Sequence, residues 1–145
     1  MVVREHRLNT ENDPVDAEGR DVKAAGLWGA SEEQSVVLDF EVTEYEERVR
    51  RTQERMAEQG LELLVVTDPS NMCWLTGYDG WSFYVHQCVV VPVDDLPLWF
   101  GRGADANGAK LTSFLPFRRL LRYPEHYVQN PLVHPLDYLP DIVKG

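Results

Sequence analysis

The segment over residues 65–81 constrains the fold of this chain more than any other stretch of its sequence. It reads V-V-T-D-P-S-N-M-C-W-L-T-G-Y-D-G-W, so that β-branched residues lead into Asp68 and Pro69 and then into a short apolar turn. Proline suits the first position of a helix, and Asp68 can accept a hydrogen bond from the free amides that follow it. Gly77 stands where a helix ends in a left-handed residue. The segment therefore predicts a strand that passes directly into a short, capped helix over 70–75.

A longer helix is predicted before this segment, over residues 44–59. Thr43 and Glu46 have the spacing of a capping box, and Gly60 ends the helical pattern. Apolar and small residues recur at helical spacing on one face, which we expect to be buried. These residues are Tyr45, Val49, Thr52 and Met56.

The other elements alternate between strand and helix patterns. A buried strand is predicted over 61–67, and a hairpin is predicted from strands over 85–92 and 96–100. Alternating strands and helices together with one hairpin indicate an α/β fold, with a mixed β-sheet flanked by helices. The remaining predicted elements are a helix over 105–114, a strand over 118–122 and a helix that starts at 136 and runs to 143.

Composition restricts the classes of partner. The net charge of −10 argues against nucleic acid, because a phosphate backbone demands a basic surface. No apolar run approaches the ~20 residues of a membrane span, and residues 1–20 are too polar for a signal peptide, so we expect a cytoplasmic protein without a membrane partner. Basic residues are nearly all arginine and acidic residues are plentiful, which suggests adaptation to high salt; the alternative is an ordinary acidic bacterial protein. The two cysteines, Cys73 and Cys88, lie in apolar segments and are expected to be reduced.

The domain boundary is expected near residue 36. Residues 1–36 are rich in acidic and small residues and lack sustained periodicity, which predicts a flexible acidic leader. Residues 37–145 then form a single domain, which is a normal length for one hydrophobic core.

A search for catalytic groups in the sequence finds none. There is no glycine-rich phosphate loop, no nucleophile elbow and no zinc-binding helix motif. The four histidines are too scattered along the chain to suggest a metal site, and His134 is expected to cap the last helix. The histidines are His6, His86, His126 and His134.

Two segments are candidates for binding. Four aromatic residues crowd into 78–84, and a small domain cannot easily bury them all, so Trp81, Phe83 and Tyr84 are predicted to form an interface or a ligand site. The alternative is that they fill the local core. After a predicted strand, Arg102 could hold an anionic group, or it could simply pair with Asp105 in a tight turn.

Several of these segments carry a family resemblance. The stretches D-P-S-N-M and L-T-G-Y-D-G-W-S-F-Y-V, together with the tryptophan strand before Gly101 and Arg102 and the motifs Y-P and Y-V-Q over 123–129, are its basis. With them, residues 40–144 resemble the N-terminal domain of the creatinase/prolidase family of M24-type, pita-bread metallohydrolases, and within it the ectoine-hydrolase branch. The resemblance implies a ribonuclease H-like mixed sheet flanked by helices.

The resemblance also implies a role. The domain itself is non-catalytic, and the chemistry belongs to a C-terminal domain, absent from this chain, whose metal-binding members use Asp, Asp, His, Glu and Glu. A divalent metal pair would belong to that domain, and no cofactor is expected in this chain. The N-terminal domain would contribute to a homodimer and to part of the partner's small-molecule pocket. Phe83 matches an aromatic of that wall, while Val85 replaces an arginine, which disfavours creatine and suits a compact cyclic amino acid.

Other functions stay open at this point. The chain could be a free-standing binding or regulatory module left after loss of a catalytic domain. It could also be the N-terminal part of an Xaa-Pro dipeptidase. An unrelated enzyme on this fold is disfavoured by the missing catalytic groups.

Overall fold

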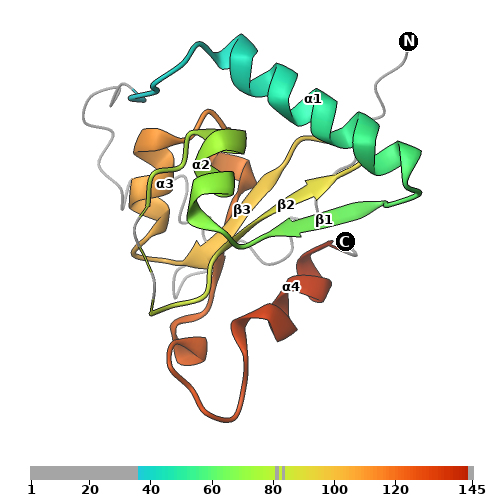
Figure 1. Cartoon of the computed structure of the whole chain (residues 1–145). Helices are drawn as coiled ribbons and strands as arrows, with labels where there is room; N and C mark the ends of the chain where they lie inside the picture. The colour runs from blue at the N-terminus through green and yellow to red at the C-terminus, as the bar shows by residue number, and fades with distance from the viewer. Residues whose placement is uncertain (1–35, 81, 83, 144–145) are drawn as a thin grey trace, which may run out of the picture. The chain divides into compact units, whose positions relative to one another are not determined.

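The computed structural model describes residues 36–80, 82 and 84–143, and its fold belongs to a unit over 34–140. Helices and strands follow one another along the chain as the sequence predicts (Figure 1). Two 3-10 turns, Phe117–Arg119 and Glu125–Tyr127, flank the last strand. The helices and strands are α1 (Val42–Glu58), β1 (Leu63–Val66), α2 (Pro69–Thr76), β2 (Cys88–Pro92), β3 (Leu98–Arg102), α3 (Ala106–Thr112), β4 (Leu120–Tyr123) and α4 (Pro135–Val143).

The four strands form one mixed sheet in the order β1-β2-β3-β4. β1 pairs antiparallel with β2, and β2 pairs antiparallel with β3 as the predicted hairpin. β3 and β4 are parallel, with Trp99 opposite Leu120, and the helix α3 makes the crossover that a parallel pair needs. The prediction of a mixed β-sheet flanked by helices is confirmed.

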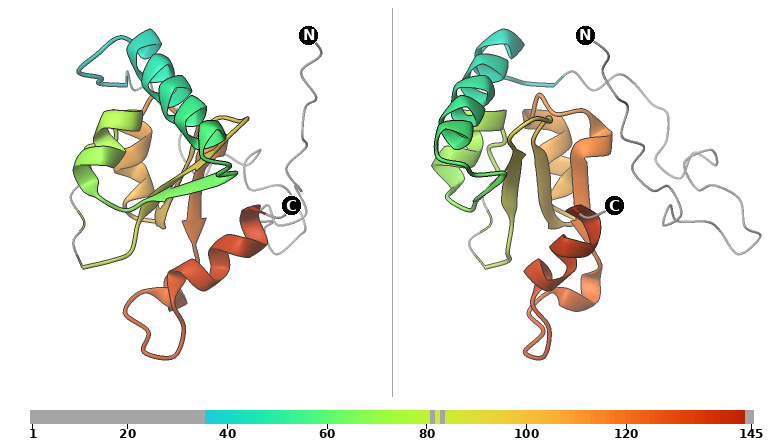
Figure 2. Two further views of the ribbon diagram at one scale, coloured as in Figure 1. Left: turned by 45° about the vertical axis from the view of Figure 1, so that its right-hand side comes forward. Right: turned by 90° about the vertical axis from the view of Figure 1, so that its right-hand side faces the viewer.

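The hydrophobic core lies between one face of the sheet and three helices. Period-two alternation places Val89, Val91 and Trp99 on this face, where they pack with Val49 of α1 and Met72 of α2. Seen with the strands nearly edge-on, α1 and α2 lie together on one side of the sheet (Figure 2). The core therefore ties the long helix and the short capped helix to the same sheet face.

The first strand differs from its prediction. β1 was predicted to be buried, but it is an edge strand of the described sheet, and Leu63 and Val65 are 40% and 41% exposed. Only Leu64 and Val66 face the core. A short apolar sequence such as that of β1 suits a central strand and an edge strand equally, so composition alone could not show that β1 lies at the edge.

The start of α1 also differs from its prediction. The capping box of Thr43 and Glu46 is wrong, because the helix begins at Val42 and its N-cap is Glu41, whose side chain makes no capping hydrogen bond. Thr43 therefore lies inside the first turn. The predicted buried face is largely confirmed: Tyr45, Val49 and Met56 are buried, while Thr52 is half-buried.

The short helix follows its local signals closely. Asp68 accepts a hydrogen bond from the Asn71 amide at 2.9 Å, Pro69 occupies the first turn, and Gly77 takes the left-handed conformation with φ of 81°. Each of these features acts within a few residues of the chain. This explains why the sequence predicts α2 so well.

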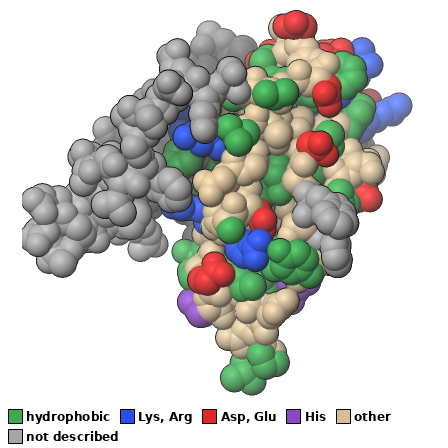
Figure 3. Space-filling model, turned by 90° about the vertical axis from the view of Figure 1, so that its left-hand side faces the viewer, with side chains coloured by type: hydrophobic (Ala, Val, Ile, Leu, Met, Phe, Trp, Pro, Cys, Tyr) green, Lys and Arg blue, Asp and Glu red, His purple; other side chains and the backbone are tan. Residues whose placement is uncertain are grey.

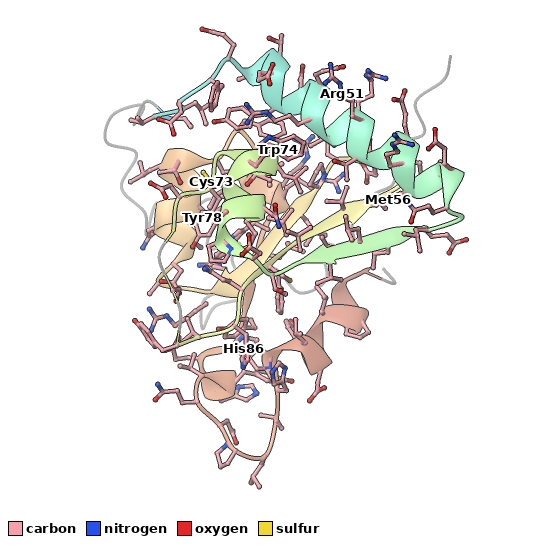
Figure 4. All side chains as sticks on the ribbon, viewed as in Figure 1. Arg51, Met56, Cys73, Trp74, Tyr78 and His86 are labelled. Atoms are coloured by element: carbon pink, nitrogen blue, oxygen red, sulfur yellow. The ribbon has the colours of Figure 1, made fainter. Side chains whose placement is uncertain are left out.

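The charges of α1 lie mainly on its exposed side. Glu47 forms ion pairs with Arg50 and Arg51 at 2.7 and 2.8 Å, and the Arg51 side chain points away from the sheet (Figure 4). On the face drawn in Figure 3, acidic side chains are scattered among other types rather than gathered in one patch. Both observations fit a solvated surface rather than a charged docking site.

Both cysteines are free. Cys88 is buried in β2, which raises the pKa of its thiol to about 11, whereas Cys73 on α2 is only half-buried. Among the described helices, none has both the length and the apolar character needed to cross a bilayer.

Candidate functional site

The aromatic segment predicted as a site begins where α2 ends. Gly77 turns the chain so that Tyr78 enters the core, where it is 2% exposed and meets the Trp99 ring edge-on at 5.3 Å. Tyr78 therefore belongs to the hydrophobic core and not to an exposed binding surface. Trp81 and Phe83 lie outside the described residues, so their predicted roles stay predictions.

Tyr78 anchors the segment through a buried hydrogen-bond chain. Its hydroxyl donates to Gln87 Oε1 at 2.7 Å, and Gln87 Nε2 donates to the Ser82 carbonyl at 3.4 Å. Burial raises the pKa of Tyr78 well above its ordinary value. Gln87 therefore links Tyr78, at the start of the segment, to the Ser82 carbonyl within it through neutral polar groups.

Tyr84 contrasts with Tyr78, because its side chain is 52% exposed. The Arg102 guanidinium lies over its ring at 5.5 Å, and Arg102 Nη2 donates to the Tyr84 hydroxyl at 3.3 Å. Two of the four predicted site residues, which are far apart in the sequence, therefore come together at the end of β3. We call this pair, with Asp105, the Arg102 cluster.

Asp105 holds the Arg102 side chain in place. Arg102 Nε and Nη2 donate to the two Asp105 carboxylate oxygens, each at 3.2 Å. The hydrogen bonds to Asp105, and to a lesser extent the one to Tyr84, raise the pKa of Arg102 above its ordinary value. The ion pair between Arg102 and Asp105, which was the alternative expected from the sequence, is therefore present in the structure. The side chain is still 19% exposed, so it can meet a ligand or another protein surface.

The Arg102 cluster supports binding rather than catalysis. A fixed guanidinium and an exposed phenol can recognise an anionic or polar group, but neither is a nucleophile with an adjacent base at neutral pH. In the part of the chain that the structure describes, no three His, Cys, Asp or Glu side chains gather into a group that could hold a metal ion. The described residues therefore do not fit the ligand set that the family resemblance implies for a metal pair.

The histidines are less scattered in space than in sequence. The rings of His86 and His134 lie 4.0 Å apart between centroids, and His134 Nδ1 accepts a hydrogen bond from the Leu136 amide at 3.1 Å. The predicted capping role of His134 is confirmed. The pairing with His86 has no signal in the sequence, because 47 positions separate the two residues.

Sequence reasoning also missed a buried arginine at the α1–α2 contact. Arg48 is 9% exposed, its guanidinium lies over the Phe40 ring at 4.4 Å, and its Nη1 donates to the Trp74 carbonyl at 3.0 Å. Its Nε also donates to Glu44 at 3.0 Å. Trp74 is 48% exposed and lies beneath α1 (Figure 4). Arg48 lies among exposed charges in sequence, so nothing local distinguishes it from a solvated one.

Comparison with known proteins identifies the family. The family model described as Creatinase/Prolidase N-terminal domain matches residues 48–144, which is well over half of the chain. This chain belongs to the creatinase/prolidase N-terminal domain family. The family assignment agrees with the resemblance seen in the aromatic segment and in the capped helix.

Two curated relatives are similar over the same region. The ectoine hydrolase of Halomonas elongata is 53% identical over 104 residues, which are 72% of this chain and 26% of that protein. An uncharacterized hydrolase/peptidase of Sinorhizobium fredii is 42% identical over 104 residues, which are 71% of this chain and 26% of that protein. The chain thus spans about a quarter of the length of these relatives.

Solved structures support the fold of this family member. A dipeptidase, PepE, from Mycobacterium ulcerans is 18% identical with a TM-score of 0.58, over 73% of this chain and 27% of that chain. The Creatinase/Prolidase N-terminal domain of an X-Pro dipeptidase from Streptococcus pyogenes is 18% identical with a TM-score of 0.52, over 68% of this chain and 69% of that chain. At these identities the similarity concerns the fold alone.

Proposed function

We propose that this chain is the non-catalytic N-terminal domain of a creatinase/aminopeptidase P-type hydrolase that acts on ectoine or a similar compact cyclic amino acid. The observation that carries the proposal is the 53% identity to an ectoine hydrolase over 104 residues. Since the matched region is 26% of that relative, the catalytic groups would be supplied by a C-terminal domain, in the same chain or in a neighbouring one.

The proposed contribution of the domain is dimerisation together with one wall of the partner's substrate pocket. This wall would consist of Trp81, Phe83, Tyr84 and Arg102. The exposed Tyr84 and the fixed Arg102 guanidinium support it, because both present binding groups at the same end of the sheet. Exposed aromatic and arginine side chains are typical of interaction surfaces with high binding energy.

The conditions under which the protein works follow from its charge. We propose a salt-rich cytoplasm, because the chain combines a net charge of −10 with few lysines. Exposed carboxylates repel one another at low ionic strength, and screening relieves this repulsion over a Debye length of roughly 10 Å at 0.1 M salt.

The wall is tested in a chimeric enzyme, in which this chain replaces the matching N-terminal region of the Halomonas elongata relative. Phe83→Ala should raise KM for ectoine or weaken dimerisation, by about tenfold or more for a hot-spot aromatic, while the melting curve stays unchanged. Phe117→Ala is the control for the loss of an aromatic side chain, because Phe117 is 56% exposed and lies outside the proposed wall. A large drop in melting temperature with normal kinetics in the folded fraction would show that Phe83 belongs to the core.

A further inference from the structure

The last helix of the described chain starts with an unusual cap. α4 begins at Pro135, so His134 is the residue that precedes its first turn. His134 Nδ1 accepts a hydrogen bond from the Leu136 amide at 3.1 Å, and the Asp137 carboxylate accepts one from the His134 amide at 3.0 Å. This is the reciprocal arrangement of a capping box, with an imidazole nitrogen in the place of the usual hydroxyl or carboxyl oxygen.

An imidazole cap depends on the protonation of the ring. A neutral imidazole has one nitrogen that accepts and one that donates, and since His134 Nδ1 accepts here, its hydrogen must be on Nε2. The next proton that the ring takes up therefore binds Nδ1. Imidazolium has two donors and no acceptor, so the protonated ring cannot bind the Leu136 amide.

A second imidazole lies against the first. The His86 ring is 4.0 Å from the His134 ring between centroids, with an angle of 49° between the planes. His86 precedes β2, and its carbonyl accepts a hydrogen bond from the Tyr123 hydroxyl of β4 at 3.0 Å, which fixes the backbone there. Burial is the larger cause that lowers the pKa of His86, and the neighbouring His134 is the smaller one. Two protonated rings at this distance would repel each other.

Titratable groups lie near the pair on α4, on β4 and on the neighbouring 3-10 turn. Asp137 faces His134 from α4, but its carboxylate oxygen binds the backbone amide. Burial raises the pKa of Tyr123 to about 12, so its hydroxyl is neutral wherever an imidazole titrates. Glu125 and His126 lie on the neighbouring 3-10 turn, where the His126 ring packs against Tyr127; no hydrogen bond or ion pair between the described atoms of this turn and either imidazole is present.

We propose that His134 and His86 form a proton-binding site that controls the first turn of α4. With both rings neutral, His134 caps the helix. Uptake of a proton at His134 Nδ1 breaks its hydrogen bond to the Leu136 amide, so the first turn of α4 loses its cap and opens. The positive charge formed on His134 then lies against the His86 ring. The capped state is complete while the His134 ring is neutral, and it is lost as the pH falls and Nδ1 takes up a proton.

The proposal is tested by NMR on the full 145-residue chain between pH 8 and pH 5. After correction for intrinsic exchange, the protection of the Leu136 amide should fall by about fivefold or more on acidification, as for loss of a typical N-cap, while Val90 in β2 stays protected. The midpoint of this change should coincide with the titration of the His134 C2 proton. Replacement of His86 by Phe keeps a ring there but removes the second titratable group, and the midpoint should still follow the His134 C2 proton.

His134→Asn is the decisive variant, because the asparagine Oδ1 can accept the same hydrogen bond as Nδ1 but does not titrate. We expect the exchange of the Leu136 amide in this variant to be independent of pH after the same correction. Three results would overturn the proposal: a constant Leu136 protection in the unmodified chain, a midpoint that differs from the His134 titration, or an unchanged pH response in His134→Asn.

Discussion

Gly77 is the position where the packing of this domain can be tested most sharply. Its φ of 81° is left-handed, and a Cβ built there would lie 2.7 Å from the Thr112 carbonyl oxygen and 2.9 Å from the Leu38 side chain. The first contact is with backbone and cannot relax cheaply. Gly77→Ala should therefore cost both the left-handed conformation, about 1–2 kcal/mol, and overpacking, about 1–3 kcal/mol, which together make about 2–5 kcal/mol.

Two other glycines separate these contributions. Gly60 is also left-handed, with φ of 67°, but a Cβ there meets nothing within 4 Å, so Gly60→Ala should cost only the conformational part, about 1–2 kcal/mol. Gly108 lies inside α3 without a positive φ and in open space, so Gly108→Ala should stabilise the protein by about 0.5–1 kcal/mol. The measurement is the free energy of unfolding in urea, followed by circular dichroism. If Gly77→Ala costs no more than Gly60→Ala, the close approach of α2, α3 and residue 38 is wrong.

Three further predictions concern the polar core, the leader and the surface charge. Tyr78→Phe should destabilise the domain by about 1–3 kcal/mol, because it leaves the buried Gln87 carbonyl oxygen without its donor; an unchanged urea midpoint would contradict the hydrogen-bond chain. A chain that starts near Val37 should keep its melting temperature within a few degrees, because the polar leader cannot bury enough surface to offset ~1–2 kcal/mol of backbone entropy per residue; loss of the fold would show that the leader is structural. Melting temperature should rise between ~0.1 and 2 M salt as screening relieves the repulsion of a net charge of −10, and a flat or falling curve would refute the salt adaptation.

The sequence predicted best those features that depend on neighbouring residues. The cap at Asp68, the proline after it and the glycine stop at Gly77 act within one short segment, and all three are as predicted. The hairpin of β2 and β3 is also local, although its strands start two or three residues later than the pattern suggested.

Features that depend on tertiary contacts could not be predicted in the same way. The sequence does not distinguish an edge strand from a central one, so Leu63 and Val65 were wrongly expected to be buried. Tyr78 and Tyr84 belong to one aromatic run, yet one is core and the other exposed, because only Tyr78 turns towards Trp99. The contact of His86 with His134 depends on how separate elements meet in space.

We propose that this chain is a non-catalytic domain that works with a separate catalytic domain. This proposal is tested most directly by measuring ectoine turnover for the chimera, for the Halomonas elongata relative without its matching N-terminal region, and for this chain alone with divalent metal. We expect turnover by the chimera, a severe loss of turnover without the N-terminal region, and no turnover by the chain alone. An inactive but folded chimera would contradict the role in an ectoine hydrolase and favour a free-standing binding module, and metal-dependent turnover by the chain alone would contradict the claim that it is non-catalytic.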